Sequence, residues 1–301
     1  MKKDLDQGLL RDVSRSFYLS LRILPAPMRP GVSLAYLLAR ASDTLADTVS
    51  VEVGKRLKWL EGFIREMDCG GREWREGLAE FSAQQKHEGE RLLLERLDEV
   101  FDALDRAPSV EQSLIRDVVA VITGGQRLDV VRFGAGAHSL ETEEELEDYC
   151  YRVAGVVGEF WTSIGFATLG HRFSTSDADQ LRSLGEEFGR GLQLVNILRD
   201  MPADLAAGRC YLPVVDRGNR EELLAEAARW RRVARQRMKL GRIYAAQMRS
   251  RRLRVAVALQ AILGERTLDL LDGADWTTLT RGVKVSRSVV RRALWDAWWI
   301  S

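Results

Sequence analysis

Two aspartate pairs at the same spacing are the residues of this chain best suited to chemistry. Asp43 and Asp47 lie four positions apart, and Asp200 and Asp204 repeat this spacing in the second half of the chain. Two carboxylates four apart on one helical face repel each other by about 0.2–0.5 kcal/mol unless a cation lies between them. Mg²⁺ prefers such oxygen ligands and is usually held by one or two carboxylates together with substrate phosphates. The pairs therefore predict a magnesium site, while a single pair of this kind is more often a solvated helix end.

Arginines accompany both pairs. Arg40 precedes Asp43 by one helical turn, Arg199 directly precedes Asp200, and Arg209 follows in the segment Gly-Arg-Cys-Tyr-Leu-Pro. The forked guanidinium group binds phosphate oxygens through two parallel hydrogen bonds. Carboxylates for a metal and arginines for phosphate together indicate a diphosphate substrate.

The stretches that carry these residues have helical periodicity. We predict helices over 31–47, 88–104, 109–133, 143–169 and 221–271, with a capping box in which Thr142 precedes Glu145. No run of alternating strands is visible, so the fold is predicted to be all-α. Pro202 lies between Asp200 and Asp204, and proline inside a helix removes a backbone donor, so we expect a kink there. A further helix is predicted from apolar residues three and four apart: Leu181, Leu184, Phe188, Leu192, Val195 and Leu198.

Length and composition limit the other classes of protein. The chain has 301 residues, 46% hydrophobic and 30% charged, with a net charge of +1, which excludes a disordered or collagen-like chain. With no linker or internal repeat, we expect a single domain over residues 1–301. The first residues lack the apolar core of a signal peptide, and no run of about 18 to 20 consecutive apolar residues occurs, so a cytoplasmic location is expected.

Cysteine and histidine are too scattered to build a metal or disulfide framework. They lack the paired spacing of zinc ligands, and their wide separation indicates reduced thiols. We therefore predict neither zinc nor disulfides from these six residues: Cys69, Cys150, Cys210, His87, His138 and His171.

A basic run stands out between residues 229 and 254, with eleven lysines and arginines and no acid. A net charge of +1 argues against nucleic acid as its partner. One hypothesis is that this run, together with Trp295, Trp298 and Trp299, contacts an anionic membrane surface, because tryptophan favours interfaces. The alternative is a solvated helix with the tryptophans in the core. The oligomeric state cannot be read from the sequence.

Four ordered segments resemble the squalene/phytoene synthase family, the head-to-head prenyl transferases. The segment at 14–17 resembles the family's N-terminal motif, 43–47 its first aspartate motif and 149–158 its central helix of tyrosine and glycine. The segment at 196–204, followed by 208–213, is similar to its second aspartate motif. The match covers most of the chain, and its form is most similar to that of bacterial squalene synthases.

The resemblance implies a single helical domain of the isoprenoid synthase type, in which the two aspartate motifs face each other across a central cavity. Family members join two prenyl diphosphates through a cyclopropyl diphosphate, then ionise and rearrange it. The expected reaction is the joining of two farnesyl diphosphates through presqualene diphosphate, with reduction by NADPH to squalene for sterol or hopanoid biosynthesis. The alternatives are dehydrosqualene or phytoene formed without reduction, and a non-catalytic assembly-factor relative.

Site residues follow from the resemblance position by position. The four aspartates of the two pairs would be the Mg²⁺ ligands, and Tyr149 would assist proton removal or stabilise the cation, its alternative being a core tyrosine with a satisfied hydroxyl. Residues expected to hold the prenyl diphosphate are Ser14, Arg15, Arg40, Arg199, Arg209, Gln193 and Asn196. Residues expected to line an apolar cavity that excludes water are Phe17, Tyr36, Val153, Val157, Gly158 and Leu192.

Some features bear on the choice of product. Many squalene synthases have an acid where this chain has Ala46 and Ala203, which would lower metal affinity or change the preference among steps. The first motif has the squalene synthase form, and the segment at 282–287, with Lys284 and Arg287, is similar to a basic segment near the nicotinamide cofactor of reductive members. No Rossmann glycine motif is present, so NADPH would bind at an unconventional site. The chain ends at Ser301 without a membrane anchor, so a soluble or peripheral protein is expected.

Overall fold

The computed structural model describes residues 8–14, 21–48, 50–134 and 136–300. Helices make up most of these residues, and the strands β1 (His138–Ser139) and β2 (Arg209–Cys210) pair in parallel over two residues each. The all-α prediction is therefore confirmed. The chain divides into two compact units, one of Met1–Gly134 with Ser163–Gly170 and one of Ala135–Thr162 with His171–Ser301. The single domain and its central cavity stay predictions.

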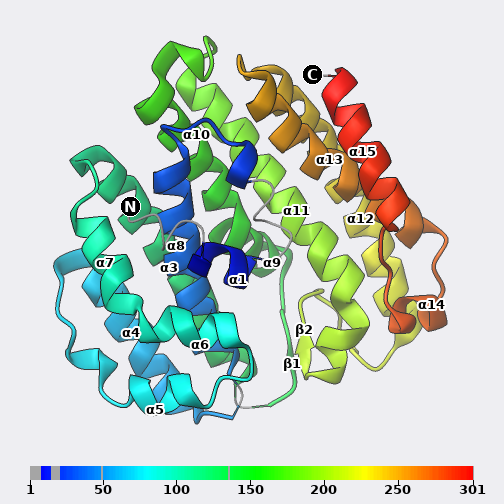
Figure 1. Cartoon of the computed structure of the whole chain (residues 1–301). Helices are drawn as coiled ribbons and strands as arrows, with labels where there is room; N and C mark the ends of the chain where they lie inside the picture. Colours follow the sequence, from blue (N-terminus) through cyan, green and yellow to red (C-terminus); the bar gives the residue numbers. More distant parts are fainter. Residues whose placement is uncertain (1–7, 15–20, 49, 135, 301) are drawn as a thin grey trace. The chain divides into compact units, whose positions relative to one another are not determined.

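Unit 1 contains the helices that run from blue through cyan to turquoise-green in Figure 1. Helix α3 starts with Pro30 in its first turn, where a missing N–H costs nothing, and buries one apolar face that includes Leu37, Leu38 and Leu45. It packs against α8 and α4, which also pack against each other. The helices of this unit are α1 (Leu10–Ser14), α3 (Arg29–Asp47), α4 (Val53–Cys69), η2 (Glu73–Arg75), α5 (Leu78–Ala83), α6 (Glu88–Glu95), α7 (Leu97–Asp105) and α8 (Ser109–Phe133).

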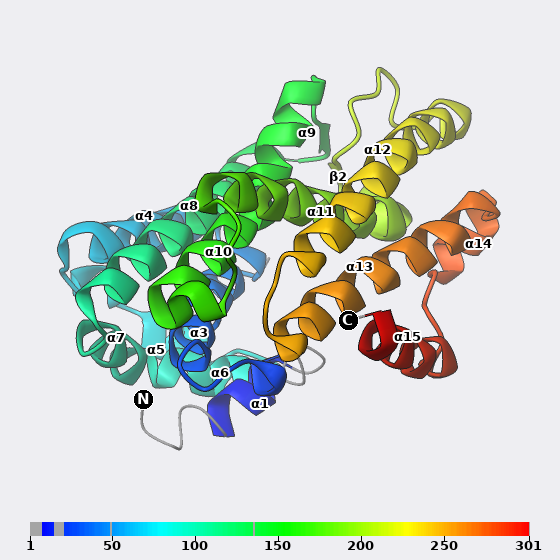
Figure 2. The same cartoon turned by 90° about the horizontal axis from the view of Figure 1, so that it is seen from above.

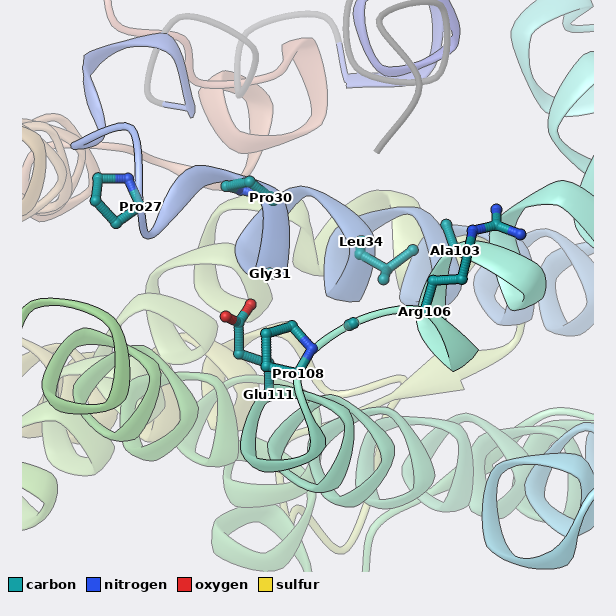
Figure 3. Close-up of a pocket in the computed structure, with 9 residues that line it drawn as sticks. Pro27, Pro30, Gly31, Leu34, Ala103, Arg106, Pro108 and Glu111 are labelled. Carbon is teal, nitrogen blue, oxygen red and sulfur yellow. The ribbon is translucent and has the colours of Figure 1, made fainter.

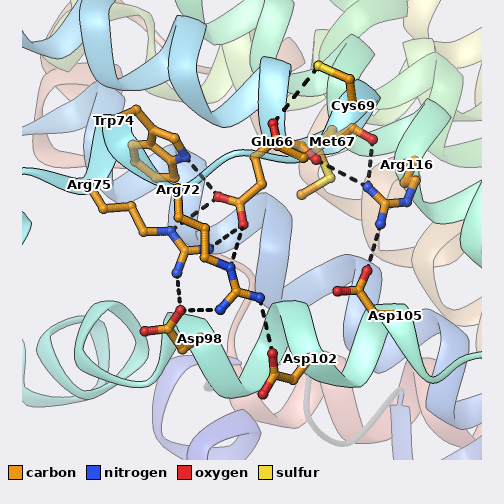
Figure 4. Close-up of polar contacts among 11 residues, drawn as sticks. Glu66, Met67, Cys69, Arg72, Trp74, Arg75, Asp98, Asp102, Asp105 and Arg116 are labelled. Atoms are coloured by element: carbon orange, nitrogen blue, oxygen red, sulfur yellow. Dashed lines mark hydrogen bonds and ion pairs between the residues drawn. The ribbon is translucent and has the colours of Figure 1, made fainter.

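A buried carboxylate ties α4 to the turn that follows it. Glu66 is only 4% exposed and accepts hydrogen bonds from Trp74 Nε1 at 2.8 Å and from the guanidinium of Arg75, as Figure 4 shows. Arg75 and Arg72 also reach Asp98 of α7. A buried charge is tolerated only when it is paired and hydrogen-bonded, and this network meets that condition. It fixes α4, η2 and α7 as one block.

Unit 2 is built around α11, which packs against α12, α13 and η3; Figure 2 shows α12 and α13 beside it. Asp177 caps α11 by accepting from the N–H groups of Asp179 and Gln180, and the helix runs through Pro202 without interruption. The helices of this unit are α9 (Glu143–Cys150), η3 (Tyr151–Gly155, a π-helix), the first half of α10 (Val156–Leu169), η4 (Gly170–Arg172, in part), α11 (Ala178–Ala206), α12 (Arg220–Ala246), α13 (Arg251–Asp272), α14 (Trp276–Arg281) and α15 (Arg287–Ile300).

Glycines let two helical segments of unit 2 touch through their backbones. A Cβ atom on Gly158 would lie 1.9 Å from the carbonyl oxygen of Gly185, and one on Gly189 would lie 2.2 Å from that of Ala154. No other residue type fits such a contact. The chain from η3 into α10 is thereby held directly against α11.

Three predicted helices prove to be divided. The stretch 88–104 is broken at Arg96, the stretch 143–169 contains the π-helix η3, and α12 ends at Ala246 before α13 begins at Arg251. Helix α8 has the predicted bounds, and Thr142 caps α9 by accepting from the N–H of Glu145 at 3.3 Å.

One stretch of the described residues, Glu143–Arg172, is long and apolar enough to cross a membrane by length and composition alone. It runs through α9, η3 and α10, and Glu159 and other polar residues interrupt it. Core helices of proteins that never enter a membrane pass the same criterion.

Candidate functional site

The first aspartate pair closes helix α3. Asp43 lies in its last turns and Asp47 is its final residue. Arg40, one turn earlier, donates to the carboxylate of Asp43 and to that of Glu90, which α6 supplies. Arg40 and Asp43 each keep about a third of their side chains exposed (32% and 33%), so a ligand can reach both.

The surroundings of Asp43 disfavour its charged form. Its pKa is raised to about 6, first by burial and then by the negative charge of Asp47, while Arg40 opposes both effects. A further positive charge beside it would favour the ionised form. Two close carboxylates that destabilise each other's charge are a donor set that fits Mg²⁺.

The second aspartate pair lies near the end of α11. Arg199 binds the carboxylate of Asp200 through two hydrogen bonds, and Arg209 Nη2 donates to Asp204 Oδ1 at 3.0 Å. The parallel pairing of β2 with β1 fixes the backbone of Arg209, whose Cα pairs with that of His138. One turn earlier in α11, Asn196 Nδ2 donates to Gln193 Oε1 at 3.4 Å. The sequence-predicted residues of this motif are thus brought together within unit 2.

Tyr149 is buried near the end of α9. Its ring stacks on that of Tyr211, with centroids 4.7 Å apart and planes inclined by 20°. Glu147 of the same helix accepts hydrogen bonds from Arg190 of α11 at 3.2 Å and from Arg237 of α12 at 2.9 Å, which ties α9 to both helices. Tyr149 therefore belongs to the same unit as the second aspartate pair.

The residues expected to line a cavity have several surroundings. Tyr36 is half-buried and its hydroxyl donates to the carbonyl of Val13 at 3.4 Å, and burial raises the pKa of this phenol. Val153 is half-buried in η3, Val157 is partly exposed, and Leu192 is half-buried in α11. Gly158 lies in the backbone contact with α11. Their role as a lining stays a prediction.

Some predicted residues lie at the edge of what the structure describes or beyond it. Arg15 and Phe17 lie outside the described residues, and Ser14 is the last residue of α1. Lys284 and Arg287 are exposed around the start of α15. Two exposed cations fit the phosphates of a dinucleotide as a surface contact, and their assignment to the cofactor stays a prediction.

Unit 1 contains a cavity of about 500 Å³ that includes none of the predicted site residues. Figure 3 shows that it lies between the start of α3 and the turn from α7 into α8, with the carboxylate of Glu111 at its wall. Burial raises the pKa of this carboxyl group. Its walls are formed by Pro27, Pro30, Gly31, Leu34, Ala103, Arg106, Ala107, Pro108 and Glu111.

Sequence reasoning missed two side chains that contact the predicted site. Glu90 lies fifty residues from Arg40 in the chain, and no local pattern links them. Tyr211 stands inside the predicted motif at 208–213, so its aromatic ring was a readable signal. Within the part of the chain that the structure describes, no group of three or more histidine, cysteine, aspartate or glutamate side chains is arranged around one metal position.

A family model for squalene/phytoene synthase matches residues 10–289, almost the whole chain. The chain belongs to the squalene/phytoene synthase family.

Curated relatives of this family member are squalene synthases. It is 29% identical over 205 residues to the squalene synthase of Yarrowia lipolytica, and 29% identical over 202 residues to that of Solanum lycopersicum. The first match covers 68% of this chain and 44% of the relative, and the second covers 65% and 43%. The matched region thus spans less than half the length of these relatives.

Solved structures share the fold. TcSQS in complex with the ligand BPH1237 superposes with a TM-score of 0.79 at 22% identity, over 98% of this chain and 86% of that one. A ligand-bound dehydrosqualene synthase gives 0.64 at 20% identity over 98% and 95%, and squalene synthase HpnC from Alicyclobacillus acidocaldarius gives 0.60 at 21% over 89% and 92%. At these identities the likeness shows the helical fold and no more.

Proposed function

We propose that this protein joins two farnesyl diphosphates head to head and, with NADPH, forms squalene. The observation that carries the proposal is the family match over residues 10–289, within which all four aspartates of the two motifs are present. The relatives in Yarrowia lipolytica and Solanum lycopersicum are squalene synthases, which favours squalene over dehydrosqualene or phytoene.

Asp43, Asp47, Asp200 and Asp204 are the proposed Mg²⁺ ligands. When bound, Mg²⁺ supplies positive charge that stabilises the departing diphosphate. The raised pKa of Asp43 beside Asp47 supports this assignment, because a cation there relieves the repulsion between the two carboxylates.

The arginines paired with these aspartates are proposed to bind the diphosphate. Arg40, Arg199 and Arg209 each hold a carboxylate through hydrogen bonds in the structure, so each is already oriented towards its motif. Binding of a metal to the carboxylates would free their guanidinium groups for phosphate oxygens. Buried Tyr149 is proposed to stabilise the carbocation or to assist proton removal.

The test is incubation of the purified protein with farnesyl diphosphate and Mg²⁺, with and without NADPH, followed by mass analysis of the hydrocarbon extract. We expect squalene only when NADPH is present. Dehydrosqualene regardless of NADPH would overturn the reductive step, and phytoene from geranylgeranyl diphosphate alone would overturn the choice of substrate.

Variants distinguish a role of the aspartates as metal ligands from a role in supporting their helices. Asp43→Asn and Asp200→Asn should each lower turnover by at least about a hundredfold, as loss of one transition-state contact does. Asp179→Asn is the matched control for Asp200→Asn, because Asp179 lies in the same helix α11 and its ion pair with Arg182 is exposed. Undiminished turnover in either of the first two variants would refute the metal assignment.

A further inference from the structure

The exposed face of α15 carries three tryptophans. Trp295, Trp298 and Trp299 are 65%, 48% and 68% exposed, whereas Ala293 and Ala297 on the other side of the helix are buried. The buried side packs against α13, and Figure 2 shows the two helices next to each other. Large apolar side chains that gather on one exposed face mark a contact surface.

Positive charge surrounds these tryptophans. Arg291 and Arg292 are exposed. Arg291 lies four positions before Trp295, and Arg292 lies seven positions before Trp299, so both arginines are on the same side of α15 as the two rings. Exposed Arg252, in the first turn of α13, adds to this charge within the same unit. Asp296, the acid within α15, is half-buried.

Several arginines in the middle of α12 are paired with acids of neighbouring helices. Arg231 and Arg235 pair with Asp272 of α13, and Arg242 pairs with Glu265 of the same helix. Arg237 pairs with Glu147 and with Glu187 of α11. Much of the basic run at 229–254 therefore holds helices together. Arg232 and Lys239 of α12 stay exposed, as do Arg252 at the start of α13 and the arginines of α15.

An ion–aromatic contact holds α15 in place. The guanidinium of Arg251 lies 4.1 Å from the ring centroid of Trp298 and donates to the carbonyl of Trp298 at 2.7 Å. The rings of Trp295 and Trp299 pair with each other at 5.8 Å and are the most exposed of the three. These two rings are thus presented on a helix that is already fixed to the protein.

We propose that this face of α15 binds an anionic lipid surface, with Trp295 and Trp299 at the level of the headgroups and Arg291 and Arg292 on lipid phosphates. Tryptophan and arginine on one exposed helix face match the interfacial region, where amphipathic rings and cationic side chains are both favoured. A second copy of the chain fits less well. A two-fold contact through this face would bring the exposed arginines of both copies into one interface, where Asp296 is the only acid that α15 itself supplies, and like charges repel.

The proposal is tested by sedimentation of the full chain with vesicles of phosphatidylcholine alone or mixed with phosphatidylglycerol. We expect binding to the mixed vesicles, a blue shift of tryptophan emission, and a decline in binding as NaCl is raised. Arg291→Gln with Arg292→Gln should lower the partition coefficient about 25-fold, about fivefold for each arginine. Trp295→Ser with Trp299→Ser should weaken binding and abolish the blue shift.

Two matched controls leave α15 intact. Arg232→Gln removes an exposed cation of α12, and Val215→Ser removes a fully exposed apolar side chain. Both should bind mixed vesicles like the unaltered chain. Absence of vesicle binding, equal binding to neutral vesicles, or self-association that the tryptophan substitutions abolish without any vesicle binding would each overturn the proposal. None of these measurements depends on catalytic turnover.

Discussion

Three arginines that the sequence assigns to a diphosphate, Arg40, Arg199 and Arg209, are each hydrogen-bonded to an aspartate that it assigns to a metal. Arg40 and Arg199 compensate the charge of Asp43 and Asp200. Opposite charge therefore orders the side chains of these motifs. If the arginines hold a diphosphate as proposed, substrate binding becomes an exchange of partners. Such an exchange loses less side-chain freedom than ordering long arginine side chains at the moment of binding.

Cysteine reactivity is a prediction at the scale of single residues. Burial raises the pKa of the Cys150 thiol and of the Cys210 thiol, so at pH 8 both stay protonated and inaccessible, whereas Cys69 is exposed. A disulfide reagent that releases a coloured thiol should therefore modify one cysteine rapidly in the native protein and the other two only in denaturant.

Cys69→Ser serves as the control for this titration. It should remove the rapid modification in the native protein and leave unchanged the modification of the two buried thiols in denaturant. Rapid modification of all three thiols in the native protein would contradict the burial of Cys150 and Cys210.

Part of the site was readable from residues alone, and part depends on tertiary contacts. The aspartate pairs and their arginines share one or two helical turns or a short following segment, so their proximity follows from helix geometry. The Arg40–Glu90 contact joins α3 to α6, and no local pattern encodes which helices pack together.

At the scale of elements, the glycine contact between η3–α10 and α11 makes a sharp prediction. Gly158→Ala would force a Cβ against the backbone of Gly185, which cannot yield as a side chain would. We expect a loss of about 3 kcal/mol, the upper end for overpacking, and a fall of several degrees in melting temperature. Circular dichroism during heating measures it.

Gly273→Ala is the matched control for Gly158→Ala, because no atom lies within 4 Å of the position where its Cβ would be built. It should melt within about one degree of the unaltered chain, since surface substitutions usually stay within about 0.5 kcal/mol. If both variants melt alike, the close approach of the two backbones is wrong.

Helix breaks show why some elements escaped prediction. The segment between α12 and α13 has neither proline nor glycine, yet Ser174 donates to the carbonyl of Gln247 at 2.8 Å and the N–H of Arg249 donates to Phe173. These contacts with a distant segment replace helical hydrogen bonds. Helix α4 was missed for another reason, since buried Arg56 and Glu66 interrupt its apolar face.

At the scale of the whole molecule, charge is nearly balanced. The net charge of +1 corresponds to a sequence isoelectric point of about 7.7. Net charge is what keeps protein molecules apart in solution, so solubility should be lowest near pH 7.7 and rise on either side, with a positive chain below and a negative chain above. Precipitation in a pH series at constant low salt measures this minimum.

A solubility minimum more than about one pH unit away from pH 7.7 would mean that groups with shifted pKa values dominate the titration, because pKa values in proteins typically scatter by about one unit. Arg291→Gln with Arg292→Gln provides the control, because removal of two positive charges should move the minimum to lower pH.

Backbone contact between two helices also limits how this protein can move. Where side chains separate helices, they can slide past each other by small rotamer changes, but Gly158 against Gly185 leaves no such layer. Any displacement of α11 on the microsecond to millisecond timescale must therefore carry η3 and the adjoining α9 with it. Tyr149 of α9 and Asp200 of α11 are then expected to move together.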